Sequence, residues 1–326
     1  MPSLQTQYLH LKLDNPIIVA SSGLTKSVEK IRECEEAGAG AVVIKSMFEE
    51  VLAQEDYGIA ASAGYHTEAI DYLRSELEMQ YGPEEYCHII REARDSVKIP
   101  VIASINCVSD KWWPQFAKKV QDAGAHALEL NVFKTATKAD LSPEQLEALY
   151  FDILEQVKKS VDIPVALKIG SNFSSLPNFA ANLVKRGADG LVLFNRFTQT
   201  DIDIKSMKLK TTFSFSSADE MRRILRWTAI LSGQVNCDFS ATTGVKTGSD
   251  VVKLILAGAS AVQVASLFYN KGLSMIGSMK KEIEQWMADK NIKSIDDFKG
   301  RLSFSESGET DQYLRVQFME KIRGVE

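Results

Sequence analysis

The chain has 326 residues, of which 45% are hydrophobic and 25% charged, and its net charge is −5. This length suits one large barrel or two ordinary domains, and the composition excludes a disordered chain or a fibrous repeat. The negative charge argues against a nucleic-acid partner, because runs of Lys or Arg do not exceed pairs such as Lys118-Lys119.

Neither the N-terminus nor the cysteines indicate secretion or a metal site. Met1 to Lys12 shows no charged-then-apolar signal pattern, and no apolar run of the sequence is long enough to cross a bilayer. We therefore expect a cytoplasmic protein without a membrane partner. The four cysteines are widely scattered and form no C-x-x-C pair, so we expect reduced thiols and no bound metal: Cys34, Cys87, Cys107 and Cys237.

In chain order, a short hairpin comes first, and alternating strand and helix patterns follow. Residues 3–13 alternate polar and apolar side chains around Tyr8, Leu9 and Leu11, which predicts a hairpin. Short apolar runs predict eight strands, at residues 17–19, 41–44, 101–103, 127–130, 165–167, 190–193, 234–237 and 261–264. Amphipathic segments predict helices at residues 27–37, 84–97, 111–122, 143–160, 175–186, 218–231, 248–257 and 273–288.

Four of these strands follow the same joint, in which glycine and alanine directly precede the apolar run. The joints are Ala37-Gly38-Ala39, Ala123-Gly124-Ala125, Arg186-Gly187-Ala188 and Ala257-Gly258-Ala259. Glycine at such a position ends a helix in the left-handed conformation, so each joint is typical of a helix that leads into a strand of a parallel sheet.

Alternating strands and helices predict a parallel α/β fold, and eight units favour a closed (β/α)8 TIM barrel over an open doubly wound sheet. The hairpin would cap the barrel floor. Residues 46–83 and 195–217 are predicted as long loops, which are typical of lids or binding loops. Residues 290–326 predict a helix, a Gly-rich turn and a short final helix outside the barrel. We therefore expect one domain over residues 1–326, with the barrel at about 15–289.

Polar residues close most of the predicted strands, and in a barrel the strand C-termini form the site, here called the mouth. These ends are Ala20-Ser21-Ser22-Gly23, Lys45-Ser46, Ser104-Ile105-Asn106, Glu129-Leu130-Asn131, Lys168 and Asn195-Arg196. Two lysines and several amides thus converge with little opposing carboxylate. Such a mouth suits a ligand that is anionic or becomes so.

The last two strand ends predict a phosphate site. Strand seven runs into Thr242-Thr243-Gly244-Val245-Lys246, and strand eight runs into Ala265-Ser266. Loops at these two positions of a barrel, with the helix N-terminus that follows, commonly hold phosphate through backbone N–H groups. The alternative is that threonine and glycine only shape two tight turns.

Taken together in order, the motifs resemble the dihydroorotate dehydrogenase family over about residues 4–290. They are Asn15-Pro16 leading to Ala20-Ser21-Ser22-Gly23, then Lys45-Ser46, Glu129-Leu130-Asn131, Lys168 and Thr243-Gly244-Val245-Lys246-Thr247-Gly248-Ser249-Asp250. The resemblance implies an FMN-dependent oxidoreductase with the flavin ring across the mouth. It places the following residues at the cofactor: Ala20, Ser21, Lys45, Ser46, Asn106, Asn131, Lys168, Asn195, Thr243, Gly244, Ala265 and Ser266. Lys168 would stabilise the anionic reduced flavin, and Lys45 would flank both ring and substrate.

The sequence departs from the family on the substrate side. Where the family has a Cys or Ser that takes a proton from substrate carbon, this chain has Lys134, and a later substrate-binding Asn is Ala136. The family's Asn-rich substrate segment appears here as residues 61–67, and one glycine near Thr243 is replaced. Lys134 could act as the base if desolvation or the nearby lysines lowered its pKa.

These observations leave three hypotheses for the function. The first is an FMN oxidoreductase that acts on dihydroorotate or a related anionic dihydropyrimidine, passes electrons to a soluble acceptor and forms a homodimer, as the resemblance implies. The second is a phosphate-binding lyase or isomerase that uses Lys134 or Lys168 as base or Schiff-base amine. The third is a flavin-binding barrel without dehydrogenase activity.

Overall fold

The computed structural model describes residues 2–49, 82–107, 113–132, 134–196, 200–211, 214–308 and 310–314. Eight parallel strands form a closed barrel, since β4 pairs with both β3 and β6. In sequence order, the barrel strands are β3 (Ile17–Val19), β4 (Ala41–Val43), β6 (Val101–Cys107), β7 (Ala127–Val132), β8 (Val165–Ile169), β9 (Gly190–Leu193), β12 (Asp238–Thr242) and β13 (Ala261–Val264). The predicted TIM barrel is confirmed.

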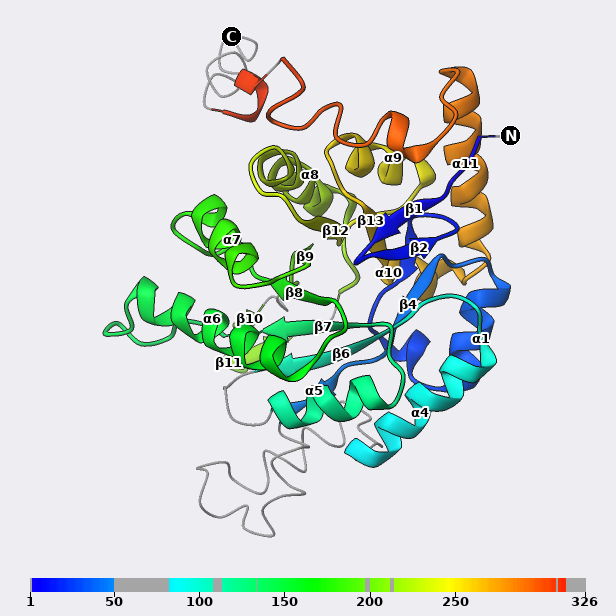
Figure 1. Ribbon diagram of the computed structural model, residues 1–326. Coiled ribbons are helices and arrows are strands. Elements are labelled where there is room, and N and C mark those ends of the chain that lie inside the picture. Colours follow the sequence, from blue (N-terminus) through cyan, green and yellow to red (C-terminus); the bar gives the residue numbers. More distant parts are fainter. Residues whose placement is uncertain are drawn as a thin grey trace.

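Helices surround the strands on the outside of the barrel (Figure 1). They are α1 (Val28–Glu36), α4 (Pro83–Ser96), α5 (Trp113–Asp122), α6 (Pro143–Ser160), α7 (Leu176–Lys185), α8 (Ala218–Ser232), α9 (Gly248–Leu256), α10 (Ser266–Lys271) and α11 (Met275–Asp289). Side chains cap several of them, as where Ser142 accepts a hydrogen bond from the Gln145 N–H at the start of α6.

All four glycine joints adopt the predicted conformation. The backbone φ angles of Gly38, Gly124, Gly187 and Gly258 lie between 89° and 111°, the left-handed region. Each glycine directly follows a helix end and is followed within a few residues by β4, β7, β9 or β13. The joint therefore acts as the sequence pattern predicts.

One predicted strand is wrong in its bounds. Residues 234–237 form the turn after α8, and the seventh barrel strand, β12, begins at Asp238, where it pairs with Gly190 of β9. The strand alternates Phe239 and Ala241 with the buried hydroxyl side chains of Ser240 and Thr242. Because those hydroxyls face the barrel interior, apolar and polar side chains alternate along this strand, and no apolar run marks it.

The N-terminal hairpin closes the floor of the barrel, the end formed by the strand N-termini. Strands β1 (Thr6–Tyr8) and β2 (Leu11–Leu13) pair in antiparallel register, and Figure 1 shows them beside β12 and β13. Tyr8, Leu9 and Leu13 are at most 1% exposed. They pack against the lowest inward-facing layer of the strands, which contains Ile18, Val43, Ile102, Ala127, Ala166, Val192 and Ala261.

Above this apolar layer, the barrel interior becomes polar. Side chains alternate along a strand, so that residues two positions after the apolar layer also face inward. The next layer contains Ser104, Glu129 and Gln263, all of which are at most 1% exposed. On these three strands, the alternation therefore replaces apolar side chains with polar ones from the floor toward the mouth.

Three segments lie outside the regular repeat. Short strand β5 (Met47–Phe48) extends the sheet beside β6. The predicted loop at 195–217 contains an antiparallel hairpin, β10 (Thr200–Asp203) with β11 (Lys208–Thr211). In place of the helix predicted after residue 290, the described tail has two 3-10 turns, Ile295–Asp297 and Thr310–Tyr313. Residues 315–326, at the end of the predicted tail, lie outside the described residues. Among the residues that the structure describes, none of the helices is long and apolar enough to span a membrane.

Candidate functional site at the barrel mouth

Strand register brings three of the predicted residues into one row at the mouth. Asn106 on β6 pairs with Asn131 on β7, and Asn131 pairs with Lys168 on β8. All three are partly buried. Because they occupy equivalent positions on neighbouring parallel strands, their side chains face the same region of the mouth.

A cavity of about 140 Å³ lies beside this row, at the ends of β3, β8, β9, β12 and β13. Its lining contains seven of the residues predicted for the cofactor: Ala20, Ser21, Lys168, Thr243, Gly244, Ala265 and Ser266. Distant parts of the sequence thus meet at one place, and they include both segments predicted to hold phosphate.

The backbone after β12 turns tightly to form one wall of this cavity. Thr243 and Gly244 both have positive φ angles, 84° and 81°. A Cβ on Gly244 would lie 2.6 Å from the Ser217 carbonyl oxygen, so the position has no room for a side chain. The Gly244 N–H donates to Ser216 Oγ at 3.1 Å, and the Ser216 N–H donates to Ser266 Oγ at 3.3 Å. Hydrogen bonds through Ser216 therefore join the two predicted phosphate segments.

Arg196 connects the end of β9 to the same wall. Its guanidinium donates to Glu220 Oε1 at 2.9 Å and to the carbonyl and hydroxyl oxygens of Ser214. Burial acts to raise the pKa of Glu220, but hydrogen bonds from Arg196 and the Ser217 N–H outweigh burial and hold that pKa below its ordinary value. This ion pair fixes residues 214–217, the segment that supports Gly244.

A row of three hydroxyls crosses the other side of the mouth. Ser46 Oγ lies 3.0 Å from Ser21 Oγ and 2.7 Å from Ser104 Oγ, and the Ser46 N–H donates to Ser21 Oγ. Lys45 is partly buried next to them, and its backbone N–H donates to the Thr25 carbonyl oxygen. The predicted Lys45-Ser46 pair therefore lies at the mouth, between β3 and β6.

The mouth also contains the carboxylate of Glu129, which belongs to a predicted strand end but not to the residues predicted for the cofactor. Glu129 is 1% exposed; its Oε2 accepts from Gln263 Nε2 at 2.6 Å, and its Oε1 lies 4.0 Å from Lys168 Nζ. The expectation of little opposing carboxylate is therefore wrong. Gln263 belongs to none of the predicted strand ends, because it lies inside the mainly apolar strand β13, where only the two-residue alternation marks it as inward-facing.

Buried acceptors at the mouth fit a cofactor that donates hydrogen bonds. Within the described part of the chain, Asn131 Oδ1 and Gln263 Oε1 are buried and have no hydrogen-bond partner. An unpaired buried acceptor is costly, so such groups in a cavity indicate a ligand. The flavin ring carries an N–H donor, and FMN carries a phosphate for the Thr243-Gly244 turn. The residues present thus fit FMN.

Asn195 and Lys134 lie at a second cavity of about 180 Å³, beyond the end of β7. Asn195 is buried, and its amide donates to the carbonyl oxygens of Val132 and Lys168. The side chain of Lys134 is exposed, so the burial proposed to prepare it as a base is absent. The Lys134 backbone hydrogen-bonds with Tyr150, and burial raises the pKa of the Tyr150 hydroxyl to about 12. The substrate segment at residues 61–67 lies outside the described residues.

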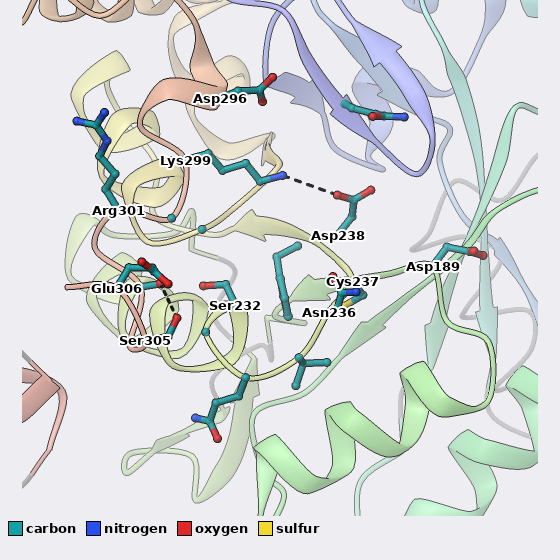
Figure 2. A pocket seen from close by; sticks show the side chains of 18 of the residues that line it. Asp189, Ser232, Asn236, Cys237, Asp238, Asp296, Lys299, Arg301, Ser305 and Glu306 are labelled. Carbon is teal, nitrogen blue, oxygen red and sulfur yellow. Dashed lines mark hydrogen bonds and ion pairs between the residues drawn. The ribbon is translucent and has the colours of Figure 1, made fainter. Parts of the chain in front are cut away.

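A larger cavity, about 1370 Å³, opens at the opposite end, between the barrel floor and the tail (Figure 2). Its charged groups serve the fold. Lys299 Nζ lies 3.9 Å from Asp238, which also accepts from Ser260 Oγ, and Asp189 accepts from Lys158. Barrel enzymes use the strand C-termini for chemistry, so this cavity is not the candidate site. In the described ranges, no cluster of His, Cys, Asp or Glu side chains could hold a metal ion.

Comparison with known proteins agrees with this geometry. A family model described as dihydroorotate dehydrogenase matches residues 3–287. Curated relatives named "Dihydroorotate dehydrogenase B (NAD(+)), catalytic subunit" include one from Thermoplasma acidophilum, 28% identical over 92% of this chain and 99% of the relative. Others are from Methanocaldococcus jannaschii, at 26% over 89% and 95%, and from Bacillus thuringiensis, at 27% over 82% and 86%. The chain belongs to the dihydroorotate dehydrogenase family, whose enzymes are FMN-dependent oxidoreductases that act on CH–CH bonds.

Proposed function

We propose that this chain binds FMN across the barrel mouth and oxidises dihydroorotate, or a closely related anionic dihydropyrimidine, in pyrimidine biosynthesis. The observation that carries the proposal is the cavity at the ends of β12 and β13 and its seven predicted cofactor residues. Beside it, unpaired acceptors of Asn131 and Gln263 face the mouth. Thr243, Gly244, Ala265 and Ser266 would hold the phosphate, and Lys168 would hydrogen-bond the ring.

FMN supplies the redox chemistry when bound, by accepting two electrons from the substrate and passing them to an acceptor. The chain's own residues would orient substrate and hold protons. We assign the role of proton acceptor to Lys134, which stands where the family has a Cys or Ser, and we place Lys45 beside the substrate. Because the Lys134 side chain is exposed, the neighbouring lysines rather than burial would have to prepare it for that role. The lysines at the mouth would also attract an anionic substrate.

The proposal also covers the electron acceptor, the cellular location and the oligomeric state of the protein. The relatives' names specify NAD⁺, and we propose a soluble electron acceptor and a cytoplasmic location for this chain, which would act as one domain over residues 1–326. We also propose a homodimer that uses the β10–β11 hairpin. Ile202, Ile204, Met207 and Leu209 on this hairpin are 61–87% exposed, a concentration of apolar surface typical of an interface. Met207→Glu should then shift the protein toward monomer in light scattering.

The visible absorption spectrum of the purified protein tests the cofactor, and anaerobic addition of dihydroorotate tests the substrate. The proposal predicts a flavin spectrum that loses its colour when dihydroorotate is added. A colourless protein that fails to bind added FMN would contradict the whole proposal. Bound flavin that dihydroorotate leaves oxidised would reject only the substrate, and it would favour the barrel without dehydrogenase activity.

A further inference from the structure

The Glu129 carboxylate is buried beside the lysine that would contact the flavin. Three strands bring the group together, since Glu129 lies on β7, Lys168 on β8 and Gln263 on β13. Glu129 is 1% exposed and the Lys168 side chain 14% exposed. A carboxylate buried this deeply requires a compensating charge or hydrogen bonds, and Lys168 and Gln263 supply one of each.

Glu129 interacts with Lys168 through charge alone and with Gln263 through a hydrogen bond. The distance of 4.0 Å between Lys168 Nζ and Glu129 Oε1 is beyond hydrogen-bond length, whereas Gln263 Nε2 donates to Oε2 at 2.6 Å. The carboxylate therefore offsets the positive charge of Lys168 without using the N–H donors of its ammonium group. Those donors stay available for a ligand above.

We propose that Glu129 is the counter-charge of Lys168 and sets how strongly that lysine favours the anionic reduced form of the flavin. The inference deepens the proposed function and rests on flavin binding at the mouth. Glu129 acts through the charge of Lys168 and is not itself a catalytic residue. An uncompensated lysine would stabilise the reduced flavin more strongly, so Glu129 keeps the cofactor able to release its electrons.

The chain permits a clean test by Glu129→Gln. The variant removes the charge and keeps the shape, and its new amide can donate to Gln263 Oε1, which has no partner among the described residues. Paired amides would then replace the hydrogen bond of the carboxylate. Glu129→Met, neutral and of similar size, serves as a second variant should the first fail to fold.

The probe is sulfite, which adds to oxidised flavin and leaves a negative charge on the ring. In FMN-loaded Glu129→Gln we expect the sulfite dissociation constant to fall about tenfold and the flavin reduction potential to rise by about 30 mV, the two-electron equivalent. Lys168→Met should move both quantities in the opposite direction, and Glu129→Asp, which keeps the charge, should resemble the wild type.

The direction in which the sulfite dissociation constant and the reduction potential change decides between the possible roles of Glu129. If Glu129 only held Lys168 in place, Glu129→Gln would weaken sulfite binding as Lys168→Met does, and that result would overturn the counter-charge role. Unchanged sulfite binding and potential in a folded, FMN-loaded variant would overturn it as well. A wild-type protein that binds no flavin would instead contradict the proposed function, so the two failures are distinguishable.

Discussion

The charged groups at the floor of the barrel bond to one another, and the unpaired groups described there are the hydroxyls of Tyr8 and Ser240. The mouth instead leaves amide oxygens, which can only accept, without partners. At the floor, Asp238 accepts hydrogen bonds from the Leu9 N–H and Ser260 Oγ and lies near Lys299. At the mouth, buried acceptors of Asn131 and Gln263 have no partner within the described ranges. Since unpaired buried acceptors reduce stability, the difference indicates that the floor serves the fold and the mouth serves a ligand.

The largest effect should come from a mouth residue that does nothing for folding. Replacing Lys134 by Ala should slow anaerobic flavin reduction by dihydroorotate about 10²–10⁴-fold, the range lost with a general base. The exposed Lys134 side chain predicts an unchanged melting temperature. Lys138→Ala, an exposed lysine of the same segment, is the control for stopped-flow measurement. Equal rates of flavin reduction in Lys134→Ala and Lys138→Ala would show that Lys134 does not act as the base.

A floor residue should show the opposite behaviour. Asp238→Ala would leave the Leu9 N–H and Ser260 Oγ without their acceptor and would remove the carboxylate near Lys299. We therefore expect a loss of about 3 kcal/mol in the free energy of unfolding by urea. FMN affinity of the folded protein should not change. Asp296→Ala removes an exposed carboxylate from the same cavity and should cost far less. A large loss of FMN affinity in Asp238→Ala would break the division between floor and mouth.

Replacing Arg196 tests whether the hydrogen bonds that hold residues 214–217 contribute to binding of the FMN phosphate. Arg196→Ala would release residues 214–217, which hold Gly244, and we expect FMN to bind about tenfold more weakly while riboflavin, without phosphate, binds as before. Flavin fluorescence measures both affinities. Arg222→Ala, whose ion pair on α8 is exposed, should leave both unchanged. Parallel losses for FMN and riboflavin would show that Arg196 supports the ring site instead.

The smallest expected effect concerns backbone strain at the mouth. Thr243 has a φ of 84°, unfavourable for a β-branched residue, so Thr243→Gly should stabilise the protein by about 1 kcal/mol in urea unfolding. Thr242→Gly, in the extended backbone of β12, should destabilise it by a similar amount. If both variants lose stability, contacts of the Thr243 side chain outweigh its strain.

Most of the fold could be predicted from the sequence because its signals are local. The glycine joints and helix periodicity depend on neighbouring residues, and the other seven strands are mainly apolar. Strand β12 was misplaced because Ser240 and Thr242 interrupt its apolar pattern. Most of the residues predicted for the cofactor lie at the mouth, since strand ends of a barrel share one edge, whereas Asn195 lies at the second cavity. Glu129 depends instead on Gln263, 134 residues away, and such a contact leaves no local mark in the sequence.

The closed floor also determines how molecules reach the flavin. Tyr8, Leu9 and Leu13 fill the lower end of the barrel, and all are at most 1% exposed. A reactant that must touch the flavin directly would therefore enter through the mouth. If the electron acceptor is such a reactant, it shares one entrance with the electron donor, and the two would replace each other in turn. The N-terminal hairpin, far from any chemistry, would in that case favour a double-displacement order in which the first product leaves before the acceptor arrives.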